Sequence, residues 1–107
     1  GRFRIRAPPE AEAGMVGAIQ NWDLHLEGCH SLKDKRAILQ SLKAGLRKQL
    51  NVAVAEVEHQ DLWQRAGIAC ATVGSDRRVV DETLRAADRL IEGTDGVRIM
   101  DTVVTAL

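Results

Sequence analysis

Aromatic side chains are scarce in this chain. Its 107 residues include two tryptophans, one phenylalanine and no tyrosine. A hydrophobic core therefore has to be built mainly from leucine, isoleucine, valine and alanine. The length suits a single domain that is large enough to fold without support from disulfides or a metal.

Cysteines are few, and long apolar runs are absent from the sequence. Cys29 and Cys70 lie far apart and neither belongs to a C-x-x-C pair, so we expect reduced thiols in a cytoplasmic protein and no zinc site. No apolar run approaches the ~20 residues of a membrane span, so no membrane partner is expected. The sequence contains neither a P-loop nor a G-x-G-x-x-G loop, and we expect no cofactor.

The first fourteen residues, "GRFRIRAPPEAEAG", differ in composition from the rest of the chain. They lack the apolar run of a secretory signal and carry two adjacent prolines. We therefore expect residues 1–14 to form a flexible tail or an upstream extension. The domain itself is expected to comprise residues 15–107, with Met15 as its natural first residue.

The remaining sequence alternates between patterns of strand and helix. In "NWDLHLE", apolar Trp22, Leu24 and Leu26 alternate with polar residues, which indicates a strand with one buried face. A helix follows, beginning at the capping residue Ser31 and carrying a stripe of leucines. The later segments predict two strands, a helix capped by Asp76 and a last strand, at residues 52–58, 66–75, 77–92 and 97–105.

This order, β-α-β-β-α-β, defines the expected fold class. Two helices that each have one apolar stripe must lie on the same face of a four-stranded antiparallel sheet. Right-handed crossovers then give the ferredoxin-like split βαβ arrangement, an α+β fold.

The clearest functional lead is the basic segment "HSLKDKRAILQSLKAGLRKQL", residues 30–50. The chain has 15 basic and 15 acidic residues, so any attraction to nucleic acid needs a local patch. This segment has six basic residues and a single acidic one, Asp34, whereas the second predicted helix mixes acidic and basic residues. The segment is either an ordinary solvated helix or a surface that follows phosphates. The RNA-binding candidates are Lys33, Lys35, Arg36, Lys43, Arg47 and Lys48.

A polar sheet face is a weaker candidate for a site. Asp23, His25 and Glu27 share parity, and we expect Glu56 and Glu58 to join them on the open face. The spacing matches no known metal-ligand signature, so neither a metal nor a catalytic site is predicted and the protein is not expected to be an enzyme. The face also lacks the aromatic residues on which RNA-recognition motifs stack bases.

Two further features suggest contacts with a partner. Trp63, in "HQDLWQR", is either a lid on the core, which we favour, or an anchor for a partner. Val52 and Val54 share parity with the outward acids, which predicts either an apolar spot on the open sheet face or an edge strand, and with it a homodimer.

The segment from 24 to 76 resembles the YlxP-like family of small bacterial proteins of unknown function. The resemblance rests on "SLKDKR", "NVAVAEV" and "QDLWQRA" and extends over nearly all of residues 16–106. Glu27 and Leu50 stand where this family usually has proline and phenylalanine. The resemblance implies a ferredoxin-like cytoplasmic protein without established catalytic residues, and its genes often neighbour those for translation and ribosome-maturation factors.

These observations predict a non-enzymatic factor that contacts structured RNA or a ribosomal subunit through its first helix. The alternative is a homodimeric protein-interaction or small-ligand-binding module that uses the open sheet face and the strand at 52–58. Binding that weakens steeply with salt favours the first hypothesis, because each phosphate contact releases counterions.

Overall fold

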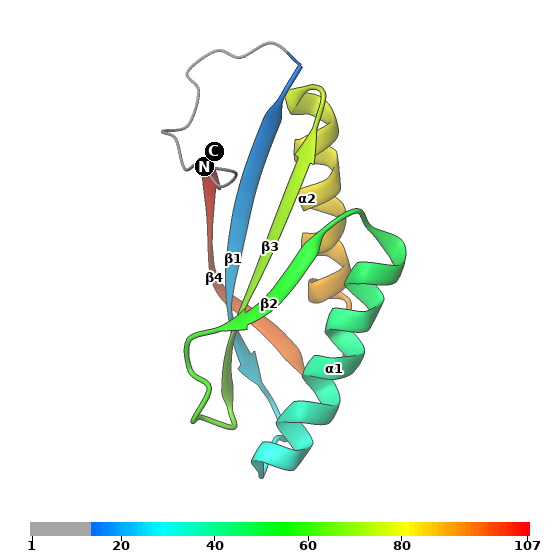
Figure 1. Cartoon of the computed structure of the whole chain (residues 1–107). Coiled ribbons are helices and arrows are strands. Elements are labelled where there is room, and N and C mark those ends of the chain that lie inside the picture. Colours follow the sequence, from blue (N-terminus) through cyan, green and yellow to red (C-terminus); the bar gives the residue numbers. More distant parts are fainter. Residues whose placement is uncertain (1–13) are drawn as a thin grey trace, which may run out of the picture.

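The computed structural model describes residues 14–107, so most of the expected tail lies outside the described residues. The order of elements confirms the predicted β-α-β-β-α-β pattern (Figure 1). The elements are β1 (Val16–Leu26), α1 (Leu32–Gln49), β2 (Ala53–Val57), β3 (Arg65–Gly74), α2 (Arg77–Glu92) and β4 (Val97–Ala106).

The four strands form one antiparallel sheet in the order β2-β3-β1-β4. Both helices lie on the same side of the sheet, and the opposite face carries no helix (Figure 1). The fold is therefore the expected ferredoxin-like α+β arrangement. The long β1 lies inside the sheet, where it pairs with β3 on one side and with β4 on the other.

The alternation in β1 decides which face the helices cover. Trp22, Leu24 and Leu26 are almost completely buried on the helix side, as predicted. The indole Nε1 of Trp22 donates a hydrogen bond of 2.8 Å to Oδ1 of Asp88 in α2. These side chains form one core with apolar residues of α1, β3 and α2, and burial of that core is the dominant favourable contribution to folding.

Both predicted helix starts are confirmed. The Ser31 hydroxyl accepts a hydrogen bond from the Asp34 backbone N–H at 3.1 Å, and Asp76 Oδ1 accepts one from the Val79 N–H at 3.0 Å. The Asp34 carboxylate in turn accepts a hydrogen bond from the backbone N–H of His30, one residue before the Ser31 N–H that a capping box uses.

The predicted facing of β2 is wrong. Val54 is buried on the helix side, and Glu56 points the same way, toward Lys35. Ala53 and Ala55 occupy the open face instead, opposite Ala71 and Ala69 of β3. The apolar spot that the alternative hypothesis placed at Val52 and Val54 is therefore part of the core side of the sheet.

Candidate nucleic-acid interface

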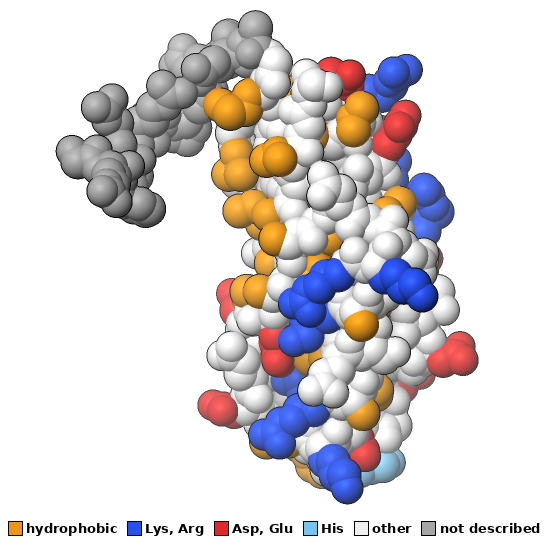
Figure 2. Space-filling view, turned by 45° about the vertical axis from the view of Figure 1, so that its right-hand side comes forward, with side chains coloured by type: hydrophobic (Ala, Val, Ile, Leu, Met, Phe, Trp, Pro, Cys, Tyr) orange, Lys and Arg blue, Asp and Glu red, His pale blue; other side chains and the backbone are white. Residues whose placement is uncertain are grey.

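Five of the six candidate cations lie on the outside of α1. Lys33, Arg36, Arg47 and Lys48 are exposed and Lys43 is half-buried; we call these five residues the basic face. Figure 2 shows lysine and arginine side chains following one another along the surface over α1. Lys33 and Lys48 are separated by about 22 Å along the helix, at 1.5 Å for each residue.

The basic face carries little opposing charge. Asp34 is the only acid in α1, and its carboxylate is engaged with the N–H of His30. Among residues 14–107, none of the five cations lies within 4.0 Å of a carboxylate oxygen. Arg47 has one internal contact, from Nη2 to the carbonyl oxygen of Val54 at 3.1 Å. The positive charge of this surface is therefore available to an external anion.

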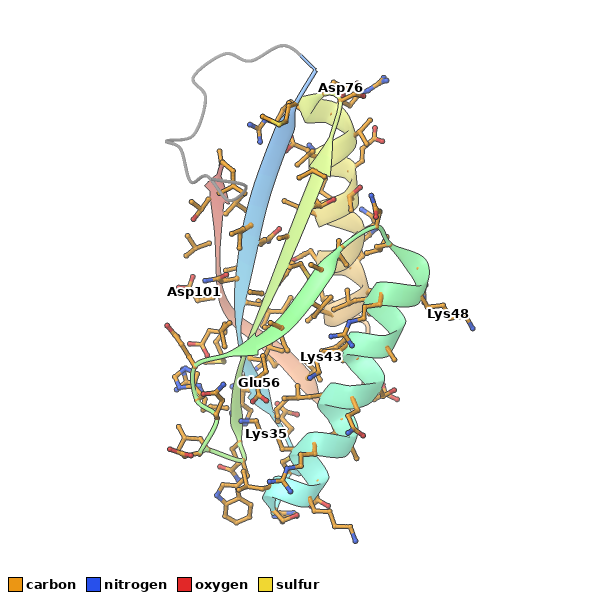
Figure 3. All side chains as sticks on the ribbon, viewed as in Figure 1. Lys35, Lys43, Lys48, Glu56, Asp76 and Asp101 are labelled. Carbon is orange, nitrogen blue, oxygen red and sulfur yellow. The ribbon has the colours of Figure 1, made fainter. Side chains whose placement is uncertain are left out.

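Lys35, the sixth candidate, is a correction to the sequence-based prediction. It is only 2% exposed, and its ammonium group lies between α1 and the sheet (Figure 3). Nζ donates to the carbonyl oxygens of His59 at 2.7 Å and Leu62 at 2.6 Å, and it lies 3.1 Å from Oε2 of Glu56. Lys35 therefore holds the β2–β3 connection against α1 and does not contribute to the basic face.

The helical spacing contains the signal for this burial. Lys35 precedes Leu39, Leu42 and Leu46 by four, seven and eleven residues, which puts it on the apolar stripe and not beside it. A lysine on such a stripe needs buried oxygen acceptors. In this protein those acceptors come from residues 56–62, whose positions the sequence pattern does not reveal.

The β2–β3 connection, residues 58–64, is also fixed from the open side of the sheet. Glu58 and His59 both have left-handed backbone conformations, with φ of 55° and 53°, which are uncommon for residues other than glycine. Arg65 Nη2 donates to Asp23 Oδ2 at 2.6 Å, and His59 Nε2 lies 3.5 Å from Asp23 Oδ1. Contacts on both faces therefore hold this connection in an otherwise unfavourable shape.

Trp63 is not the predicted lid on the core. Its side chain is 42% exposed, and neighbouring Leu62 is 47% exposed. Because Lys35 binds the carbonyl oxygen of Leu62, Trp63 lies at the same end of the molecule as the first turns of α1, which carry Lys33 and Arg36. The structure thus brings an exposed aromatic ring to the end of the basic face.

The polar groups predicted on the open sheet face are only partly assembled. Asp23 and His25 lie there, opposite Asp101 and Arg98 of β4, but Glu56 faces the helix side. In the described part of the chain, no group of three His, Cys, Asp or Glu side chains is arranged to hold a metal ion. Within residues 14–107, no helix is both long enough and apolar enough to cross a membrane.

Both cysteines are free and buried. Burial raises the pKa of the Cys70 thiol from 9.0 to about 11. Burial, together with the nearby negative charge of Asp34, raises the pKa of Cys29, and Lys35 partly offsets this. Since the folded pKa values are raised, the stabilisation by the neutral thiols is complete below pH 9 and, for Cys70, is lost as the pH rises from about 9 to about 11.

We expect both thiols to react slowly with iodoacetamide at pH 8 in the folded protein, because the thiolate is the reactive form. Modification of each cysteine should be at least about a hundredfold slower than in the urea-unfolded chain, since access requires opening of the core. Mass spectrometry of single Cys29→Ser and Cys70→Ser variants measures each rate separately. Similar rates in the folded and unfolded chains contradict this prediction.

The fold and the exposed helix define a small ferredoxin-like domain with one basic helical surface. Residues 17–104 match the family model DUF503, described as a protein of unknown function, and the chain belongs to this family. It is 36% identical over 55 residues to the uncharacterized protein YlxP of Bacillus subtilis (strain 168). The aligned segment covers 51% of this chain and 60% of that relative.

Similarity to solved structures concerns the fold alone. The de novo designed protein Foldit4 superposes with a TM-score of 0.50 and 11% identity, covering 85% of this chain and 96% of the design. SnoaB, a cofactor-independent oxygenase from Streptomyces nogalater, gives a TM-score of 0.45 and 9% identity over 89% of this chain and 92% of its own. The second similarity is too distant to bear on activity.

Proposed function

We propose that this protein is a small non-enzymatic factor that binds structured RNA, such as that of a ribosomal subunit, through the basic face of α1. The observation that carries the proposal is the row of five cations, of which none is paired with a carboxylate of the described residues. Double-stranded RNA is bound mainly through its shape, phosphates and 2′-hydroxyls, and a rigid row of cations suits that mode.

The exposed indole of Trp63 supports the same proposal. Bases in loops and bulges of RNA stack on aromatic rings, and such contacts are tolerant of sequence. Trp63 lies at the end of α1 where Lys33 and Arg36 begin the basic face. An RNA element with a duplex stem and an unpaired base can therefore contact the helix and the indole together.

The test is binding to purified bacterial 30S and 50S subunits and to a labelled RNA hairpin, from 50 to 200 mM salt. The affinity for the hairpin should fall with a log–log slope of about −0.7 to −0.9 for each phosphate contact, so five contacts weaken binding by roughly two orders of magnitude over this range. The triple variant Lys33→Gln, Arg36→Gln, Lys43→Gln should reduce the steepness of the slope by about 2 to 3. Arg47 is retained because it bonds to Val54.

A matched control removes the same amount of charge elsewhere. The variant Arg77→Gln, Arg78→Gln, Arg98→Gln has the same net charge as the triple variant of α1, and all three of its sites are exposed. It should bind nearly as the wild type does. The proposal is overturned if both triple variants lose the same affinity. It is also overturned if the wild type binds none of the three probes. Trp63→Ala should weaken binding without changing the salt slope, since stacking releases no counterions.

A further inference from the structure

The two edges of the sheet differ in how well they are protected. The β2 edge strand is five residues long, and Nη2 of Arg47 donates a hydrogen bond to its Val54 carbonyl oxygen. The β4 edge is ten residues long, and every residue from Met100 to Leu107 is exposed. An exposed edge strand presents unpaired backbone N–H and C=O groups to another chain. β4 is therefore the stronger candidate for pairing with an additional strand.

The exposed part of β4 carries an exposed valine on each face. Val103, 58% exposed, lies on the open face opposite Asn21, and Val104, 53% exposed, lies on the helix side opposite Gln20. Soluble proteins usually guard such an edge with lysine, proline or a covering segment. Within the described residues, no helix covers the outer side of β4, and its second half has neither lysine nor proline.

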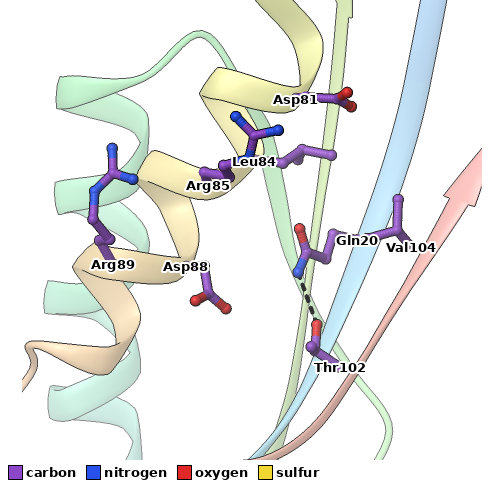
Figure 4. Close-up of a pocket in the computed structure, with 8 residues that line it drawn as sticks. All are labelled: Gln20, Asp81, Leu84, Arg85, Asp88, Arg89, Thr102 and Val104. Carbon is purple, nitrogen blue, oxygen red and sulfur yellow. Dashed lines mark hydrogen bonds between the residues drawn. The ribbon is translucent and has the colours of Figure 1, made fainter. Parts of the chain in front are cut away.

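A groove of about 510 Å³ runs between α2 and β4. Its sheet side contains Gln20, Thr102 and Val104, and its helix side contains Leu84 and four charged residues of α2 (Figure 4). Gln20 is only 7% exposed and donates from Nε2 to the Thr102 hydroxyl at 2.9 Å. A strand added at the edge of β4 would direct alternate side chains into this groove.

The outer charges of the groove's rim are complementary to those of a second, antiparallel copy. Along α2 the rim reads Asp81, Arg85, Asp88 and Arg89, so an antiparallel copy centred on Arg85 sets Asp81 against the partner's Arg89. Arg85 then lies level with the partner's Arg85, and the partner's Asp88 is less than one helical turn away. None of these four groups lies within 4.0 Å of an oppositely charged group of another described residue. An isologous two-fold contact makes each pairing twice, so Asp81 and Arg89 form two opposite-charge contacts across the axis.

We propose that a second copy of this chain docks here, with the two β4 strands antiparallel and the two sheets joined into one. In a pairing centred on Val103, this residue lies beside the partner's Val103 on the open face. Thr102 then lies beside the partner's Val104 in the groove. The two α2 helices, each packed over β1 and β3, are then three to four strand spacings apart, ~14–19 Å, and arginine and aspartate side chains of both helices extend into the space between them.

A charge swap tests this arrangement in the full chain by analytical ultracentrifugation. Asp81→Arg and Arg89→Asp each create two like-charge contacts across the two-fold axis, and each should weaken dimerisation by about tenfold. The double variant restores opposite charges and should recover most of the wild-type affinity. Asp81 and Arg89 lie ~12 Å apart along one helix, so recovery cannot arise within a single chain.

A control separates this interface from a dimer formed through the open sheet face. Val73 is 65% exposed on that face, in the interior strand β3, so Val73→Lys should leave an edge-to-edge dimer intact. Amide exchange should also show concentration-dependent protection in β4 and not in β2. A wild type that stays monomeric, a double variant no better than the single ones, or a dimer abolished by Val73→Lys overturns the proposal. None of these outcomes decides whether α1 binds RNA, because the two surfaces lie on different helices.

Discussion

Replacement of Lys35 by alanine is expected to lower the free energy of unfolding by about 3–5 kcal/mol, because it leaves a partly buried carboxylate and two carbonyl groups without their cation. The carboxylate is that of Glu56, and the carbonyl oxygens belong to His59 and Leu62. Urea unfolding followed by circular dichroism gives the value. The loss should exceed that of most single substitutions, since the lysine connects α1, β2 and the β2–β3 connection at one point.

Lys33→Ala is the matched control, since it removes the same side chain two residues earlier at an exposed position. It should change the free energy of unfolding by no more than about 0.5 kcal/mol. In the double variant Lys35→Ala, Glu56→Ala, the free energy of unfolding should fall by less than the sum of the two single-variant changes. Each single variant leaves one charged partner behind, and the double variant leaves none. Equal losses for Lys35→Ala and Lys33→Ala would show that the buried ammonium contributes little to stability.

Gly67→Ala is the second substitution that we expect to lower the free energy of unfolding strongly. A Cβ atom at this position in β3 would clash directly with the carbonyl oxygen of Val57 in β2, where the chain leaves the sheet. Backbone cannot move aside as a flexible side chain can, so β2 and the β2–β3 connection have to shift. We expect a loss of about 2–4 kcal/mol in the free energy of unfolding, measured by the same urea titration.

The control for Gly67 is another strand glycine. At Gly17 in β1, the three atoms nearest to an added Cβ belong to the side chains of Val73 and Leu107, at 3.4 to 3.6 Å. Gly17→Ala should therefore be neutral or stabilising by up to about 1 kcal/mol, since alanine restricts the unfolded chain. A similar change in both variants would mean that the close approach at Gly67 relaxes without cost.

The order of elements could be predicted from the sequence because each element has a clear period and a clear boundary. Trp22, Leu24 and Leu26 alternate along β1, and Ser31 and Asp76 cap the helices. These signals are local, and they agree with the topology that β-α-β-β-α-β order permits.

The candidate site was less predictable because its details depend on contacts between distant segments. The pattern of β2 places Val54 and Glu56 on one face, but the contacts that bury this face come from distant residues, namely the core around Val54 and Lys35 beside Glu56. The exposure of Trp63 likewise depends on how Lys35 and Asp23 hold residues 58–64. The row of cations itself could be predicted, with the exception of Lys35.

The place of β1 inside the sheet has a consequence for how the chain folds. β1 is the first strand of the fold to be synthesised, yet one of its two neighbours is β4, so that Ala18 pairs with Ala106. During translation the edge of β1 that pairs with β4 stays unpaired until β4 has left the ribosome. Contacts between such distant residues slow folding. The four-stranded sheet can therefore be completed only after synthesis of β4. A chain that ends before β4 leaves β1 without one of its two neighbouring strands.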